Sequence, residues 1–293
     1  MAVCVVSGAS GLVGSEIVAQ LLRTGHEVRA WRNSASSSTS SNIEYTQVRL
    51  GRTPIAAVEP LFAGADVFIH CAWDLQVATW DDIERVNVDG SIAWFEGAAR
   101  RGVRKLIFVS SVSAYTGCRS MYGRSKLLVE AAVTRLGGVN VRPGIVHGDP
   151  TAGVYGRLWQ STSASFIPLI DGGHQHMLTV HREDLALAIT RILDDYAQWK
   201  GRTIVIGHPE LVTLRGMLER MLEARGRTAH FVTVPSQPVL FALRCAERAG
   251  LRLQFRSDSL LTLMGEEPRV ERGVLQELKV PFRSLDDALK SRV

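Results

Sequence analysis

The feature that most constrains the fold of this chain is a glycine-rich turn near its N-terminus. An apolar run at 2–7 leads into the segment 8–14 (Gly-Ala-Ser-Gly-Leu-Val-Gly), and a helical pattern follows over 12–24. Glycine is needed where a backbone turns tightly or approaches a pyrophosphate, and a helix N-terminus offers unpaired N–H groups to phosphate oxygens. The pattern therefore predicts a dinucleotide-binding turn. The residues expected against the cofactor here are Gly8, Ser10, Gly11, Leu12, Val13 and Gly14.

Short apolar runs alternate with helical patterns over the first half of the chain. The runs lie at 2–7, 27–31, 66–71, 104–109 and 138–142, and the helical patterns near 12–24, 79–101 and 120–136. This alternation is typical of right-handed β-α-β units, which form a parallel sheet with helices on both faces. After about residue 150 shorter elements follow, with helices near 182–196 and 213–225, strands at 203–206 and 229–234, and a helical stretch opened by Pro235 and Pro238.

We therefore predict an α/β fold of the Rossmann type, a doubly wound and mainly parallel sheet with a smaller C-terminal α/β substrate lobe. Residues 1–150 would form the cofactor-binding domain, to which a later segment at about 180–207 returns. Residues 151–293 would form mainly the small substrate-binding lobe. The length of 293 residues lies at the upper end of what one hydrophobic core supports.

The chain has a formal net charge of +5 and a pI near 9.2, values that invite a nucleic-acid interpretation. The basic residues are mostly arginines spread along the sequence, without long blocks of like charge or interleaved aromatic residues. We therefore expect a small-molecule substrate and no nucleic acid. No apolar run reaches the ~18 residues that a membrane span requires, so no membrane partner is expected.

The cysteines and histidines give no sign of a metal site. Cys4, Cys71, Cys118 and Cys245 are scattered without a CxxC spacing, which favours a reducing, cytoplasmic location. The N-terminus shows no basic region or cleavage site, so no signal peptide is expected. Histidines 174, 176 and 181 have no carboxylate or cysteine at helical ligand spacing, and we expect no metal.

The end of the second predicted strand bears on the choice of cofactor. Arg32, followed by Asn33, stands where NAD-specific folds carry an acidic residue on the ribose 2′-hydroxyl. An arginine at this place can hold a 2′-phosphate through its planar fork, and Ser34 could add a hydroxyl. A surface arginine in an arginine-rich chain is the alternative interpretation. We favour NADP, with NAD as the other candidate.

A tyrosine and a lysine share one face of the helix predicted over 120–136. Tyr122 and Lys126 are four residues apart, one turn of the helix. A tyrosine of ordinary pKa is a poor proton donor or acceptor at neutral pH, and a nearby ammonium is expected to lower that pKa. Upstream, the buried strand at 104–109 ends in a serine cluster at 110–113, which could donate to an oxygen that becomes negative during hydride transfer.

Together these features resemble the extended branch of the short-chain dehydrogenase/reductase superfamily, the NAD-dependent epimerase/dehydratase family. Further segments carry the resemblance over nearly the whole chain. They are 66–72 (similar to D-x-x-x-H-x-A), 87–90 (N-V-x-G), 142–148 (R-P-x-x-V-Y-G), 180–186 (H-V-x-D-x-A), and 277–281 with 284–289 (L-G-x-P and S-L-E-E-G-L).

The resemblance implies a role for individual residues. Tyr122 would be the catalytic acid/base, Lys126 its ribose-binding partner that lowers its pKa, and Ser111 the group that polarises the substrate oxygen; Ser110 and Ser113 are weaker candidates. Asn87 would stabilise the central helix or touch a water. Further residues implied along the cofactor are Cys71, Ala72, Trp73, Val109, Pro143 and Ile145. Trp73, Ser111, Ser113 and His147 are the candidates for the substrate cleft, with ordinary packing as the alternative for Trp73 and His147.

Relatives also pair the helices equivalent to 79–101 and 120–136 across a dimer, so a homodimer through these helices is expected. The chain departs from nucleotide-sugar members at two places. Ile145 stands where they carry an asparagine and Met177 where they carry an arginine, so polar groups that would hold a diphosphate are missing, although Arg157 or Arg182 could substitute. Arg49 replaces an acidic residue after the third strand and adds to the case for NADP.

These observations predict an NADPH-dependent carbonyl reductase or alcohol dehydrogenase. Hydride would pass between the nicotinamide and a ketone, aldehyde or secondary alcohol, with tyrosine as acid/base. The first alternative is an NAD-dependent nucleotide-sugar epimerase or dehydratase that recycles a tightly held cofactor. The second is a non-catalytic NADP-binding regulator, although such proteins usually lose the tyrosine or the lysine. The apolar segment 239–264 would form either a lid packed on the core or an apolar wall over the substrate.

Overall fold

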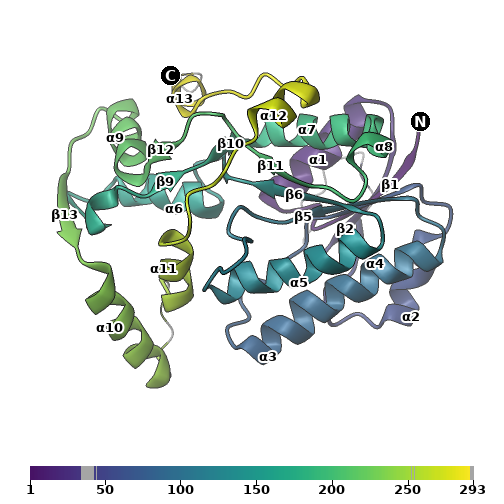
Figure 1. Cartoon of the computed structure of the whole chain (residues 1–293), viewed down its shortest axis with the longest axis horizontal. Helices are drawn as coiled ribbons and strands as arrows, with labels where there is room; N and C mark the ends of the chain where they lie inside the picture. The colour runs from purple at the N-terminus through teal and green to yellow at the C-terminus, as the bar shows by residue number, and fades with distance from the viewer. Residues whose placement is uncertain (34–42, 44, 252, 254, 291–293) are drawn as a thin grey trace.

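The computed structural model describes residues 1–33, 43, 45–251, 253 and 255–290 (Figure 1). Its centre is a seven-stranded sheet in the order β11-β6-β5-β4-β1-β2-β3, in which every pairing is parallel. The strands are β1 (Val3–Ser7), β2 (Glu27–Arg32), β3 (Tyr45–Gln47), β4 (Val67–His70), β5 (Lys105–Val109), β6 (Val139–Pro143) and β11 (Thr203–Ile206). The strand order reverses between β1 and β4, and open α/β sheets bind ligands beyond the carboxyl ends of the strands at such a point.

Helices cover both faces of this sheet (Figure 1). The helices over one face are α1 (Leu12–Arg23), α7 (Arg182–Asp194), α8 (Tyr196–Trp199) and α12 (Arg272–Leu278). Over the other face lie α2 (Ile55–Val58), η1 (Glu59–Phe62), α3 (Trp80–Ile83), η2 (Glu84–Asp89), α4 (Gly90–Arg100) and α5 (Met121–Arg135). Two apolar clusters, one on each side of the sheet, form the core. The strands of the sheet are therefore buried on both faces, as their apolar sequences require.

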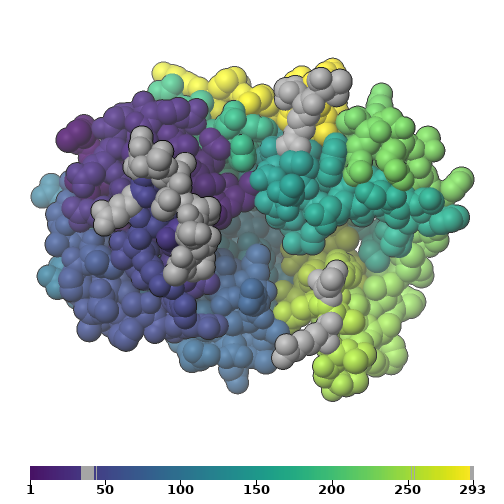
Figure 2. Space-filling model, turned by 180° about the vertical axis from the view of Figure 1, so that it is seen from behind, coloured from purple at the N-terminus to yellow at the C-terminus, as the bar shows by residue number. Residues whose placement is uncertain are grey.

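The second half of the chain adds a lobe beside the carboxyl ends of the strands. Its strands are β7 (Ile145–His147), β8 (Phe166–Ile170), β9 (His176–Met177), β10 (Thr179–His181), β12 (Val212–Thr213) and β13 (His230–Val234). Its helices are α6 (Gly153–Ser161), η3 (Asp171–Gly173), α9 (Leu214–Ala224), α10 (Ser236–Arg248), α11 (Ser257–Leu263) and α13 (Leu285–Lys290). A third apolar cluster, which includes Tyr155, Met217 and Leu285, holds the lobe together. Seen from behind, the surface is hollowed along the border between this lobe and the first half of the chain (Figure 2).

The predicted fold class is confirmed, and each strand and helix predicted in the first half begins and ends within about two residues of an observed element. The segment around residues 180–207 returns to the sheet, because α7 lies against α1 and β11 pairs with β6. One expectation differs in detail. The single helix predicted over 79–101 is interrupted by the π-turn η2, a local widening that often marks functional sites. The division into domains at residue 150 stays a prediction.

Candidate active site

The glycine turn lies where β1 meets both β4 and α1. Gly8 has a φ of +66°, and a Cβ on it would lie 2.7 Å from the backbone nitrogen of Ala72, just beyond β4. A Cβ on Gly14 would lie 2.2 Å from the carbonyl oxygen of Gly8. Any larger side chain at either position would push these three segments apart. The glycines therefore allow the close approach of turn, strand and helix that a dinucleotide site needs.

The start of α1 fits the phosphate-binding role expected of it. Gly11 caps this helix without a side-chain hydrogen bond, and no other side chain of the described residues accepts from its first N–H groups. Ser10 and Gly11 are exposed, and Leu12 and Val13 are half-buried, which leaves the turn accessible from outside. A pyrophosphate can accept hydrogen bonds from such N–H groups and is favoured by the positive end of the helix dipole. The turn thus fits a dinucleotide on structural grounds as well as by its sequence.

Two arginines meet beside the end of β2. The guanidinium of Arg32 lies 4.9 Å from the ring centre of Tyr45, and within the described residues its Nε has no hydrogen-bond partner although it is buried. Arg49 reaches the same corner, because its Nε donates to the carbonyl oxygen of Asn33 at 3.4 Å. Ser34, the hydroxyl considered from the sequence, lies outside the described residues. The region at the end of β2 therefore carries positive charge, and among the described residues the buried Arg32 Nε has no hydrogen-bond acceptor.

A buried histidine network fixes the residues that follow β4. The ring of His70, fully buried, lies between two hydroxyls, with Nδ1 2.6 Å from Ser7 Oγ and Nε2 2.8 Å from Ser91 Oγ. Burial lowers the pKa of His70 well below 6.5, so the ring is neutral. Ser7 Oγ in turn accepts hydrogen bonds from the backbone N–H groups of Cys71 (3.2 Å) and Ala72 (3.4 Å). In the sequence this histidine stands only as part of the 66–72 motif, and the network was not predicted.

Asn87 also holds this loop in place. It lies in the π-turn η2, and its side chain bonds the backbone of Asp74 twice, accepting from N–H at 2.8 Å and donating to C=O at 2.9 Å. Both polar ends of the amide are thereby used within the protein. The Asn87 side chain thus bridges the helix to the loop after β4, and its place along the cofactor stays a prediction.

Ser111, Tyr122 and Lys126 come together at the carboxyl end of β5. Tyr122 and Lys126 lie on α5, whose cap residue Ser120 accepts a hydrogen bond from the N–H of Gly123 at 3.1 Å. The Ser111 side chain lies close enough to the Tyr122 hydroxyl to lower the pKa of the tyrosine. Ser111 Oγ also donates to Ser113 Oγ at 3.2 Å and accepts from the Ser113 N–H at 3.1 Å. The neighbouring Ser110 is buried and its hydroxyl has no partner among the described residues.

Lys126 is an almost fully buried cation, with 3% of its surface exposed. Its Nζ donates to the carbonyl oxygen of Val109 at 2.9 Å and lies 3.8 Å from the ring centre of Trp73. The Trp73 ring is also perpendicular to the ring of Tyr122, at 6.2 Å between centres. Burial lowers the pKa of Lys126 to about 7, partly opposed by Cys71 and Glu130. Cys71 itself stays a thiol, because burial raises its pKa to about 12.

The pKa of Tyr122 differs from the sequence-based expectation. Burial raises it above 10, and the hydrogen bond to Ser111 opposes the rise. Lys126 does not lower it here, because its ammonium turns toward Val109 and Trp73 and lies 5.8 Å from the centre of the tyrosine ring. In this structure the tyrosine is therefore a phenol at neutral pH.

The remaining candidate residues lie around this centre at different depths. Pro143, buried at the end of β6, accepts a hydrogen bond from the Val112 N–H at 3.2 Å and so ties the serine loop to the sheet. Ile145, on β7, packs against the apolar cluster of the lobe, as does Met177. His147 is fully buried, with its ring 5.3 Å from that of His181 and 5.9 Å from that of Tyr155. Its surroundings match the packing alternative considered from the sequence.

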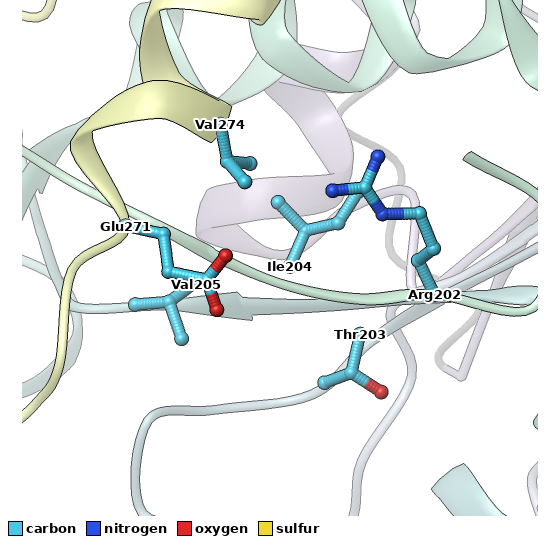
Figure 3. Close-up of a pocket in the computed structure, with 6 residues that line it drawn as sticks. All are labelled: Arg202, Thr203, Ile204, Val205, Glu271 and Val274. Carbon is cyan, nitrogen blue, oxygen red and sulfur yellow. The ribbon is translucent and has the colours of Figure 1, made fainter. Parts of the chain in front are cut away.

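Among the described residues, no three His, Cys, Asp or Glu side chains stand close enough together to hold a metal ion. A hollow of about 190 Å³ beside the edge strand β11 is lined by Arg202–Val205, Glu271 and Val274, none of which belongs to the candidate site (Figure 3). In the same described residues, no helix combines the length and the apolar character needed to cross a membrane.

The fold and the site together resemble those of nicotinamide-dinucleotide-dependent enzymes of the short-chain dehydrogenase/reductase type. A model of the "NAD dependent epimerase/dehydratase family" matches residues 4–207, and the chain belongs to that family. The resemblance stated from the sequence is thereby confirmed. The match extends through β11, the last strand of the central sheet.

Individual relatives are more distant. The chain is 29% identical over 225 residues to the ceramide reductase of Caulobacter vibrioides, covering 73% of this chain and 65% of that protein. It is 27% identical over 269 residues to an uncharacterized protein, y4nG, of Sinorhizobium fredii, covering 84% of this chain and 66% of that one. The chain thus spans just under two thirds of each. Among solved structures, that of gox2253 superimposes with a TM-score of 0.78 at 21% identity, over 99% of this chain and 96% of that one.

Proposed function

We propose that this chain is an NADPH-dependent carbonyl reductase for ketones or aldehydes that carry no nucleotide. The observation that carries the proposal is that the Ser111 side chain lies close enough to the phenol of the half-buried Tyr122 to oppose the rise of its pKa, one helical turn from Lys126. These side chains lie at the carboxyl end of β5, next to the point where the strand order reverses. The membership of the family supports a nicotinamide cofactor.

The chain's own residues would act on the substrate oxygen. A bound NADPH supplies the hydride for the carbonyl carbon. Tyr122 donates its phenolic proton to the oxygen, and Ser111 donates a hydrogen bond that stabilises the charge developing there. Lys126 would bind ribose hydroxyls and stabilise the tyrosinate until a proton returns from solvent.

The preference for NADP is supported by the corner around Arg32. Among the described residues its buried Nε has no hydrogen-bond partner, and Arg49 bonds the carbonyl oxygen of the adjacent Asn33, so a 2′-phosphate here would meet two guanidinium groups. A charge-assisted pair of this kind contributes about 1.5–3 kcal/mol, equivalent to a preference of roughly tenfold to a hundredfold. Arg32→Glu should weaken NADPH binding by that factor and leave NADH binding nearly unchanged, as measured by nicotinamide fluorescence. Equal loss for both cofactors would contradict the NADP assignment.

The choice of a substrate without a diphosphate is supported by the lobe. Ile145 and Met177, which stand where nucleotide-sugar members carry polar residues, both pack against its apolar cluster. The name of one relative, ceramide reductase, also indicates reduction of an apolar compound. The test is oxidation of NADPH with a panel of ketones and aldehydes of increasing apolar size. Tyr122→Phe should abolish turnover, and a Tyr122→Phe variant that keeps full activity would show that another group is the acid.

A nucleotide-sugar epimerase or dehydratase is the second candidate, and the family match is the observation that favours it. Such an enzyme keeps its cofactor bound and regenerates it in each cycle, whereas a reductase consumes one cofactor per product. Mass spectrometry of the small molecules released from the purified protein separates the two. Tightly held NAD with a nucleotide sugar would favour the epimerase, and NADP without one the reductase.

A further inference from the structure

The helix that carries Tyr122 is capped by a carboxylate from the opposite lobe. Asp258 belongs to α11, and its Oδ1 accepts a hydrogen bond from the N–H of Met121 at 2.5 Å. Its Oδ2 accepts from the N–H of Tyr122 itself at 3.2 Å, although the two residues are 136 apart in sequence. Figure 1 shows α11 lying against the N-terminal end of α5.

This cap completes the hydrogen bonding at the start of α5. A helix leaves its first N–H groups without partners inside the helix, and a carboxylate there is favoured by the helix dipole. Here Ser120 takes the N–H groups of Gly123, through its hydroxyl, and of Arg124, through its carbonyl. Asp258 takes the two that remain, those of Met121 and Tyr122. The tyrosine backbone is therefore held from the side of the lobe.

The residues next to Asp258 bind other parts of the site's surroundings. Arg256 donates through Nη2 to the carbonyl oxygen of Ala78 at 2.7 Å, in the segment that follows Trp73. Ser257 donates through its N–H and its hydroxyl to the carboxylate of Glu247 on α10, at 2.8 and 2.6 Å. Residues 256–258 thus join α10, the segment before α3 and the start of α5. We call these residues the lobe clasp.

We propose that Asp258 is a positioning residue that sets the place of Tyr122 from the substrate lobe, so that seating of the lobe and alignment of the catalytic acid are coupled. The inference rests on the proposed role of Tyr122 as the acid. Because Asp258 accepts a hydrogen bond from the backbone N–H of Tyr122, a shift of α11 moves the start of α5 and with it the Tyr122 phenol. Displacement of a reacting group by about 1 Å can lower a rate by a factor of about a hundred.

The test compares Asp258→Ala and Asp258→Asn with the parent and with Asp287→Ala. Asp287 also lies in the first turn of a helix, where it accepts from the Ser284 hydroxyl at 2.7 Å, but α13 is at the far side of the lobe (Figure 1). We expect Asp258→Ala to lower kcat about tenfold or more, to raise the deuterium isotope effect on hydride transfer, and to leave the Kd of NADPH within about twofold. Asp258→Asn, which keeps one accepting oxygen, should fall between Asp258→Ala and the parent, and Asp287→Ala should match the parent.

A purely structural role would lower the unfolding temperature of Asp258→Ala without changing kcat or the isotope effect, and that result would overturn the proposal. Backbone hydrogen exchange at Met121 and Tyr122 gives a second readout that needs no substrate. It should become at least about tenfold faster in Asp258→Ala, since both amides lose their acceptor. Unchanged exchange would refute the clasp. If the parent itself reduces no carbonyl compound, the proposed function fails. The hydrogen exchange of Met121 and Tyr122 in Asp258→Ala then still tests whether Asp258 holds the start of α5.

Discussion

Replacing Lys126 by methionine should make this protein more stable and less active. The lysine is 3% exposed, and its pKa falls from 10.5 to about 7 on burial. At about 1.4 kcal/mol per pH unit, this shift means that burying Lys126 costs about 5 kcal/mol at neutral pH. Methionine has a similar length and no charge, but it loses the hydrogen bond to Val109 and the contact with Trp73, together about 2–4 kcal/mol. The expected net gain is about 1–3 kcal/mol in the free energy of unfolding.

The pH dependence gives the sharper test of this reasoning. Below about pH 7 Lys126 carries its proton in both the folded and the unfolded chain, so its contribution is constant. Above about pH 7 the folded protein loses that proton while the unfolded chain keeps it, so stability rises with pH. Between about pH 7 and 8.5 the parent should gain roughly 1–2 kcal/mol through this group. Over the same range the Cys71 thiol, whose pKa is raised to about 12, contributes little.

Urea unfolding at the two pH values measures this difference in the parent and in Lys126→Met. The variant should be the more stable at the lower pH and should lack most of the rise toward the higher pH. Lys290→Met, at an exposed position on α13, serves as the matched control and should keep the rise of the parent. A Lys126→Met variant that is less stable than the parent and keeps the same pH dependence would refute the claim that burying the Lys126 ammonium lowers the stability of the folded protein.

Three further substitutions test other contacts. Gly8→Ala should lower stability by more than about 1 kcal/mol and abolish cofactor binding, because the methyl group would meet the backbone of Ala72. Unfolding curves measure the stability and nicotinamide fluorescence the binding, and binding as in the parent would contradict the expected clash. Arg283→Ala should cost about 2 kcal/mol, since it removes the partner of the buried Asp184 carboxylate; an unchanged unfolding midpoint would argue against this. We also propose a homodimer formed through α4 and α5, where Leu128 is 43% exposed. Leu128→Glu should then shift the mass measured by gel filtration to that of a monomer. A parent protein that already elutes as a monomer would exclude this dimer.

The parts of the site that could be predicted are those set by local sequence. The glycine turn, the serine-ended strand and the pair on α5 each lie within a few residues, and their spacing is fixed by strand and helix geometry. The alternation of strands and helices likewise predicted the parallel sheet. The strand β3 gives no apolar run because it has only 3 residues, too few to show a period, and only the family resemblance placed a third strand before Arg49.

The rest depends on contacts between residues far apart in the chain. Ser7 and Ser91 meet around His70, and nothing in their separate surroundings distinguishes them from other buried hydroxyls. The predicted direction of the Tyr122 pKa shift was wrong, because burial raises the pKa and the nearby lysine turns elsewhere. Asp258 reads in the sequence as an ordinary first-turn aspartate of its own helix, and only the packing of the lobe brings it to the start of α5.

The central claim is that the chain reduces a carbonyl group with net consumption of NADPH and a proton from Tyr122. The most direct measurement is incubation with NADPH deuterated at nicotinamide C4, followed by mass analysis of the products. The account predicts an alcohol that has gained one deuterium, formed in equal amount to NADP⁺, by the parent and not by Tyr122→Phe. Conversion of a nucleotide sugar with no net oxidation of added NADPH and no deuterium in the product would contradict it.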